Sequence, residues 1–176
     1  MNLFVTDPDP VVAARNQCDK LLVKMILETA QMLSTAHRIL DGTLASGKRK
    51  AWVHPSLDSV LYKATHYNHP SSVWLRTTAD NYEWGYKHFS AMCDEYTYRF
   101  GKTHKTDSVL RSVLKHPPTA LKRSTQTAFV KCMGASPESL AIAEPVAAYR
   151  HFYQTKQNRF KMVWTKRPVP SWFKHN

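Results

Sequence analysis

The run CDKLLVKMILETAQMLSTAH, which starts at Cys18, carries apolar residues at helical spacing and constrains the fold more than any other segment. The stripe that repeats every three or four residues consists of Leu22, Met25, Ile26, Thr29, Met32, Leu33 and Ala36. Such a stripe predicts an amphipathic helix over residues 16 to 39, ended by Asp41-Gly42. Because a long helix has to bury its apolar stripe against other elements, the chain needs a largely helical core.

Three charged residues form a second pattern on the same helix. Lys20, Lys24 and Glu28 recur every four residues and therefore lie in one row on one face. One interpretation is an ordinary surface pair of Lys24 and Glu28, which stabilises a helix by about 0.2–0.5 kcal/mol. The other is that Glu28 acts as a general acid or base, since a single carboxylate suffices when burial or partners tune it.

The excess of positive charge points to an anionic partner. The chain of 176 residues has a formal net charge of +12 and a pI near 9.8, with basic residues spread along its length. This distribution favours one folded domain, residues 1–176, with a positive face that attracts DNA. No apolar run approaches the roughly 20 residues of a membrane span, so we expect no membrane partner.

Cellular location follows from the start of the chain and from the cysteines. MNLFVTDPDP has two Asp and two Pro where a secretion signal needs a basic and then an apolar stretch. The three cysteines are widely spaced and odd in number, which favours reduced thiols over a disulfide framework. We therefore expect a cytoplasmic protein. We also expect a monomer.

A second long helix is predicted over residues 71 to 99, with Gly101 as its stop. Its aromatic residues exceed what one core stripe needs. Residues 43 to 72, which include the basic run 48–50, show little periodicity. A segment of that length without regular structure inside a compact domain is usually functional.

The remaining helices are shorter. Asp9 and Pro10 predict a helix that ends near residue 14, and Thr106-Asp107 predict a cap for a helix over residues 108 to 115. Pro145 predicts the start of a final helix that extends to about residue 159. The fold class is therefore all-α, or mainly helical, with three main helices and long connecting loops.

The segment THYNHPSSVWLR is a candidate for contact with a nucleic-acid backbone. It contains His66, His69 and Arg76, with Ser71 and Ser72 as further donors to phosphate. The alternative is that these histidines cap or brace a loop. Because no Cys, His or Asp partner stands at ligand spacing, we expect no metal site.

The segment EYTYRFGKTHKTD combines basic and aromatic residues at a helix end. Arg99 and Lys102 are explained by compensation of the helix dipole, but His104 and Lys105 in the following loop are not. Basic residues interleaved with aromatic ones suit contacts to phosphates combined with base stacking. Together with Lys20 and Arg150, these residues are predicted to bind DNA.

Aromatic side chains are candidates for stacking on a base. Trp84, Tyr82 and Tyr96 lie in the predicted second helix, and Trp164 and Trp172 lie in the basic C-terminal tail. The alternative is that all five pack in the core. We predict that at least one tail tryptophan is exposed on the basic face, and we include Trp84 among the DNA-binding residues.

Several nucleotide and hydrolase motifs are absent from the sequence. It contains no GxxxxGK[ST], GxGxxG, HExxH or GxSxG, and no deaminase HxE combined with CxxC. Nucleotide-driven motor or kinase chemistry is therefore disfavoured. We expect no cofactor.

Five segments resemble a widespread group of small phage proteins: MNLFV, the helix starting CDKLLVKM, THYNHPSSVWLR, NYEWGYKHFSAMCDEYTYRFGKTHKT and KRPVPSWFK. That group in turn resembles, distantly, the T4-type pyrimidine-dimer DNA glycosylase, or endonuclease V. The resemblance covers most of the chain except about residues 43–60 and 115–140. It implies an endonuclease V-like fold, and a phage protein that works on duplex DNA in an infected bacterium.

The resemblance also implies a mechanism. In the glycosylase family an N-terminal amine attacks the sugar C1′ atom and forms an imine, assisted by a helix glutamate, which falls on Glu28 here. Because Met is not normally removed before Asn, the amine would be that of Met1 rather than Asn2. We therefore expect Met1, Asn2, Lys24 and Glu28 to converge on one cleft.

Three functions are compatible with these residues and with the resemblance. The first is a glycosylase and lyase acting on pyrimidines in DNA. The second is a phage transferase that attaches an amino acid to an activated 5-hydroxymethyl pyrimidine in DNA. The third is a non-catalytic DNA-binding protein that keeps the same fold.

Overall fold

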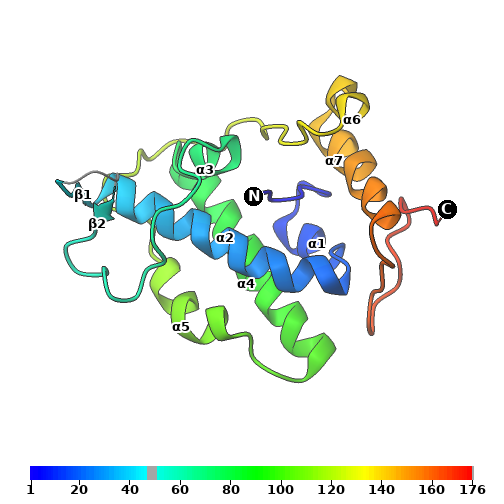
Figure 1. Ribbon diagram of the computed structural model, residues 1–176, viewed down its shortest axis with the longest axis horizontal. Helices are drawn as coiled ribbons and strands as arrows, with labels where there is room; N and C mark the ends of the chain where they lie inside the picture. The colour runs from blue at the N-terminus through cyan, green and yellow to red at the C-terminus, as the bar shows by residue number, and fades with distance from the viewer. Residues whose placement is uncertain (47–50, 176) are drawn as a thin grey trace.

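Two long helices, α2 (Asp19–Leu40) and α4 (Ala79–Phe100), lie against each other at the centre of the molecule (Figure 1). The computed structural model describes residues 1–46 and 51–175. The described chain is mainly helical, as predicted, with one short two-stranded hairpin. Within these residues, no helix combines the length and the apolarity that a membrane crossing requires.

The prediction of the first long helix is confirmed. The apolar stripe is buried along α2, with Leu22, Ile26 and Leu33 fully covered. The helix begins at Asp19 rather than near residue 16. It starts later than predicted because Cys18 is extended (φ −70°, ψ 159°) and stands outside the helix as its N-cap.

The second predicted helix is two helices, so the prediction of one continuous element over residues 71 to 99 is wrong. α3 (Pro70–Leu75) ends at Arg76, and α4 begins after Thr78. The Thr78 side chain accepts a hydrogen bond from the Asn81 N–H at 3.1 Å, which caps the new helix. Gly101 ends α4 with a left-handed φ of 68°, as the sequence predicted.

The shorter helices follow local caps. Asp9 caps α1 (Pro10–Arg15) through the N–H groups of the first turn, as predicted. His104, and not the predicted Thr106-Asp107 pair, caps α5 (Lys105–Leu114), because its Nδ1 accepts the Thr106 N–H at 3.2 Å. The remaining helices are α5 (Lys105–Leu114), α6 (Pro137–Ala141), α7 (Pro145–Gln154) and the 3₁₀ helix η1 (Thr155–Asn158). The predicted final helix is thus an α-helix that tightens into a 3₁₀ turn.

The irregular region after α2 contains a hairpin that the sequence did not reveal. Strands β1 (Thr43–Leu44) and β2 (Trp52–Val53) pair antiparallel, at the left edge of Figure 1. Strands of two residues are too short to give an alternating pattern. The basic run 48–50 lies outside the described residues.

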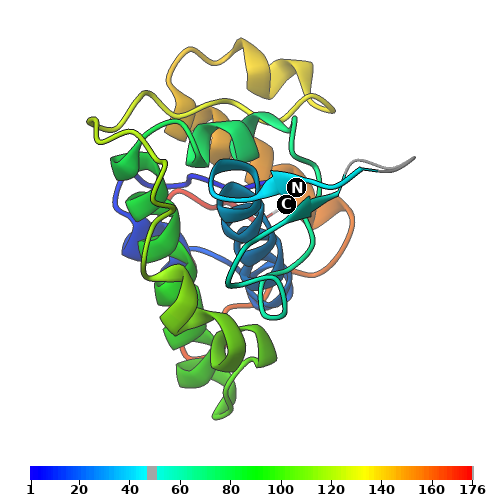
Figure 2. The same cartoon turned by 90° about the vertical axis from the view of Figure 1, so that its left-hand side faces the viewer.

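The N-terminal segment is buried beside α2 and α7. Leu3, Phe4 and Val5 are each no more than 4% exposed, and the Phe4 ring stacks on Phe152 of α7 at 5.9 Å between centroids. In Figure 1 the start of the chain lies between α2 and the α6–α7 pair, and Figure 2 shows the same arrangement after a quarter turn. This packing places Met1 and Asn2 next to the charged row of α2.

Candidate active site

A pocket of about 320 Å³ lies where the N-terminal segment, α2, residues 132–135 and the α7–η1 segment meet. The polar and charged residues in its lining are Met1, through its amine, Asn2, Lys24, Glu28, Lys156 and Arg159. Aromatic rings form its apolar part, contributed by Phe4, Phe152 and Phe160. The pocket therefore combines ionisable groups with surfaces suited to a planar ring.

Glu28 is the centre of the charged groups in this pocket. Its Oε2 atom accepts the Asn2 N–H at 3.2 Å and lies 3.8 Å from the Met1 amine, while Oε1 lies 3.4 Å from Lys24 Nζ. The Glu28 side chain is 14% exposed, whereas that of Lys24 is 64% exposed. The structure thus brings together the four residues expected to converge, with the carboxylate next to a primary amine.

The start of the chain is fixed by side-chain hydrogen bonds. Asn2, itself 7% exposed, donates from Nδ2 to the Cys132 carbonyl at 2.7 Å and accepts the Phe4 N–H at 2.8 Å. Ser71 of α3 donates to the Cys132 sulfur at 3.1 Å. These contacts hold the Met1 amine at Glu28 instead of leaving the terminus free.

Two basic residues in the pocket were not predicted. Lys156 and Arg159 follow α7, and the Lys156 ammonium lies 3.5 Å from the centroid of the Phe152 ring. Burial, followed by the nearby charges of Arg159 and Lys24, lowers the pKa of Lys156 to about 8. The sequence signal that could have indicated these two pocket residues is their i,i+3 spacing directly after an amphipathic helix.

His69 lies near the same charges. Its Nδ1 accepts the Ser71 N–H at 3.3 Å and caps α3. Burial lowers the pKa of His69, the Met1 amine and His66 lower it further, and Glu28 opposes them. His69 therefore has the capping role that the sequence left open, while His66 is exposed and its Nδ1 pairs with the Thr65 hydroxyl at 2.8 Å.

Arg99 is not available to DNA, so the prediction for this residue is wrong. Its side chain is fully buried, with Nη1 donating to the Gln17 carbonyl at 2.7 Å and to Asp19 at 3.1 Å. Nε donates to Glu95 at 3.2 Å, and Nη2 donates to the Arg15 carbonyl at 2.9 Å. Arg99 thus joins α4 to the turn between α1 and α2.

Trp84 is also buried, which overturns its assignment to DNA binding. The ring is 4% exposed, and its Nε1 donates to the Pro8 carbonyl at 2.7 Å. Arg150 is half-buried and donates to the Thr6 carbonyl at 2.8 Å and to Asp7 at 3.2 Å. Both residues anchor the segment that leads from the pocket to α1.

The other predicted DNA contacts lie at the surface or near it. Lys20 is exposed beside the pocket, with its ammonium 4.5 Å from the centroid of Phe160. Lys102 is exposed in the connection between α4 and α5, and Lys105 is exposed as the first residue of α5. Arg76 is half-buried after α3, where burial lowers its pKa and Nη1 has no hydrogen-bond partner among the described residues.

Neither tail tryptophan is exposed, so that prediction is wrong. Trp164 is 6% exposed and donates from Nε1 to the Asn16 carbonyl at 2.9 Å. Trp172 is half-buried against Tyr153, with the Arg150 guanidinium 5.7 Å from its ring centroid. The tail closes the core against the α1–α2 turn and α7.

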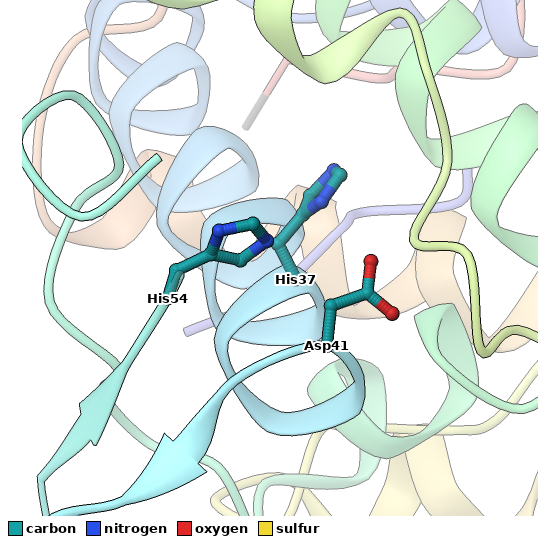
Figure 3. Close-up of side chains that lie close together, drawn as sticks. All are labelled: His37, Asp41 and His54. Carbon is teal, nitrogen blue, oxygen red and sulfur yellow. The ribbon is translucent and has the colours of Figure 1, made fainter. Parts of the chain in front are cut away.

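A second cluster of ionisable groups lies at the far end of α2. His37, Asp41 and His54 each offer a ligand atom, and these atoms lie within 4.8 Å of one another (Figure 3). Hydrogen bonds to other protein groups already engage all three residues. His37 Nε2 shares a hydrogen bond with the Tyr82 hydroxyl at 2.8 Å, and Asp41 accepts two backbone N–H groups at 2.7 and 2.9 Å.

The hydrogen bonds of His54 oppose metal binding in this cluster. Its Nδ1 accepts the N–H groups of Ser56 and Leu57 at 3.3 and 3.0 Å, so in the neutral ring Nε2 carries the proton. A nitrogen that binds a metal has to be unprotonated. Burial lowers the pKa of His37 to about 4, so this ring is neutral at pH 7, and it packs against the His54 ring beside the hairpin at 6.1 Å between centroids.

Comparison with known proteins gives no relative from which to carry over a function. No model of a known family, no curated protein and no solved structure matches the chain. The chemistry of the Glu28 pocket therefore has to be argued from its own residues.

Proposed function

We propose that this chain is an enzyme that acts on pyrimidine bases in duplex DNA, as a glycosylase and lyase of the endonuclease V type. The observation that carries the proposal is the position of Glu28, which contacts the Met1 amine, the Asn2 N–H and Lys24 at the edge of one pocket. The resemblance in the sequence supplies the same pairing of an N-terminal amine with a helix glutamate.

The proposed chemistry begins at the amine. An amine acts as a nucleophile once it has given up its proton to a base. In the proposed reaction the Met1 nitrogen attacks the sugar C1′ atom as the base leaves. Glu28, 3.8 Å from that nitrogen, takes up its proton and later returns one.

The walls of the pocket suit a flipped nucleotide. An enzyme that acts on a base in a duplex has to extrude it, at a cost of a few kcal/mol. The rings of Phe4, Phe152 and Phe160 offer apolar contact to a base, and stacking contributes about 1–3 kcal/mol per base. Lys24 and Arg159 stand at the same pocket and offer charge to the flanking phosphates.

Borohydride trapping tests this proposal. The reagent reduces an imine between enzyme and sugar to a stable amine, and the duplexes would carry a pyrimidine dimer or no damage. We expect a covalent adduct with the dimer duplex alone, mapped to Met1 by peptide mass analysis. A chain extended by two glycines before Met1 is the matched control, because the extension moves the amine away from Glu28.

Other outcomes separate the alternatives. A mass gain on a duplex that contains an activated 5-hydroxymethyl pyrimidine, without any adduct, would support the DNA base-modifying transferase. DNA binding with no turnover on any of these substrates, and no effect of Glu28→Gln, would leave a non-catalytic binding protein.

A further inference from the structure

Lys156 differs from the other lysine of the pocket in its surroundings. Lys24 is mostly exposed and pairs with Glu28, whereas the Lys156 ammonium lies 3.5 Å from the ring centroid of Phe152 and 5.9 Å from that of Phe4. Within residues 1–46 and 51–175, no carboxylate lies at ion-pair distance from it. Lys156 is therefore a partly desolvated amine without a counter-charge.

Two positive groups flank this amine. Arg159 on the residues after η1 and Lys24 on α2 both disfavour a further proton on Lys156, and burial disfavours it more strongly. With its pKa lowered to about 8, about one Lys156 in ten is unprotonated at pH 7. Desolvation combined with a neighbouring cation is a known way to activate a lysine for attack on a carbonyl group.

We propose that Lys156 is a second carbonyl-reactive amine of this pocket, which forms an imine with an aldehyde that carries a phosphate. The Nζ lone pair forms the new bond to the aldehyde carbon. The nitrogen then loses two protons, and the carbonyl oxygen leaves as water that carries them, so no oxidant or reductant is required. In the reaction proposed above, on which the identity of the aldehyde rests, this ligand is the ring-opened deoxyribose at an abasic site.

The pocket has groups suited to both the phosphate and the aldehyde of such a ligand. The phosphate would lie against Arg159 and Lys24, since a guanidinium and an ammonium bind phosphate oxygens through charge-assisted hydrogen bonds. The aldehyde carbon would lie at Lys156, above the Phe152 ring.

The direct test uses 2-deoxyribose 5-phosphate and cyanoborohydride at pH 7.5, with labelled lysines identified by peptide mass analysis. Lys161 is the internal reference because it is exposed and lies outside the pocket lining. We expect Lys156 to be labelled at least about tenfold faster than Lys161, because its lower pKa leaves more of it unprotonated. Lys156→Arg, which keeps the positive charge, should remove this fast label, and Lys161→Arg should leave it unchanged.

Equal labelling of Lys156 and Lys161, or fast labelling of Met1 alone, would overturn the inference. A second arm uses a duplex with an abasic site and the chain extended before Met1. We expect this chain to be trapped through Lys156, and trapping to disappear when Lys156→Arg is added. Trapping that survives Lys156→Arg would also count against the inference.

These outcomes separate the inference from the proposed function. A chain that leaves the dimer duplex unchanged while Lys156 is labelled rapidly would refute dimer excision and retain the reactive lysine. A chain that forms the Met1 adduct while Lys156 reacts no faster than Lys161 would refute the reactive lysine and retain dimer excision.

Discussion

Two carboxylates of the helix α2, Asp19 and Glu28, are used in different ways. At the start of α2, Asp19 accepts from Arg99 and from the Thr165 N–H and hydroxyl, so its carboxylate is enclosed by donors. Glu95 in the same network accepts from Arg99 at 3.2 Å and from Arg167 at 2.6 and 3.0 Å. Nine residues after Asp19, Glu28 stands at the edge of an open pocket.

The difference between the two sites lies in charge balance and exposure. The Arg99 network is closed, because its central guanidinium is fully buried and its donors end on carboxylates and backbone carbonyls. The described lining of the Glu28 pocket contains one carboxylate and four basic groups, which are the Met1 amine, Lys24, Lys156 and Arg159. A network in which each charge is paired stabilises the fold, whereas an open pocket with excess positive charge favours an anionic ligand.

The largest effect on stability is expected from Arg99→Ala. This substitution leaves the partly buried carboxylates Glu95 and Asp19 without a major partner, and breaking a buried ion pair costs about 3–5 kcal/mol. Lys102→Ala, at an exposed position three residues later, is the control and should change stability by less than about 0.5 kcal/mol. Urea denaturation measures both, and equal stability of the two variants would show that the Arg99 network is not structural.

The next effect is a loss of stability in acid. Burial lowers the pKa of both His37 and His88 to about 4 in the folded protein, below the ordinary value near 6.5. The unfolded chain therefore binds more protons between pH 6.5 and 4, so this contribution is complete above pH 6.5 and is lost as pH falls toward 4. Each histidine contributes up to about 3 kcal/mol.

Denaturation midpoints at pH 7 and pH 4.5 check this linkage. His88→Gln should reduce the difference between the two pH values, because glutamine does not titrate in this range. An unchanged difference in that variant would show that His88 is not the group responsible.

A smaller effect is expected on the salt dependence of DNA binding. Each phosphate contact contributes a slope of about −0.9 to the plot of log affinity against log salt on duplex DNA. Lys20 is exposed beside the pocket, so Lys20→Ala should flatten the slope by about one unit. Lys87→Ala is the matched control, since Lys87 pairs with Glu83 on α4 at 2.7 Å and lies outside the Glu28 pocket. If Lys87→Ala changed the slope more than Lys20→Ala, DNA would lie on a different face.

Local patterns in the sequence were sufficient to predict the long helices. The stripe of α2 follows a 3.6-residue period, Asp9 has a backbone partner two residues later, and Gly101 supplies a left-handed conformation that other residues avoid. Each of these features is decided within a few residues of the chain. The break between α3 and α4 was missed because a single Thr78 side chain decides it.

The roles of individual charged residues could not be predicted in the same way. From the sequence, Arg99 is explained by compensation of the helix dipole, because it is a basic residue at the end of a helix. Its partner Asp19, however, lies 80 positions away in the sequence. Lys156 was missed because the pocket combines four separate segments of the chain. Its proximity to Lys24 depends on tertiary packing, which no local pattern records.

We propose that Glu28 takes part in a reaction on DNA, and the substitution Glu28→Gln probes this role without changing the shape of the side chain. Glutamine keeps the shape and an acceptor for the Asn2 N–H but cannot exchange a proton, and general acid–base catalysis contributes about 10²–10⁴-fold in rate. The control is Glu83→Gln, in which the replaced carboxylate is 59% exposed and also pairs with a lysine four residues away.

The measurement is turnover of a dimer-containing duplex, alongside DNA affinity. We expect turnover to fall at least about 100-fold for Glu28→Gln with affinity unchanged within about threefold, and we expect no change for Glu83→Gln. Equal turnover in the Glu28 and Glu83 variants, at unchanged affinity, would show that Glu28 takes no part in the reaction.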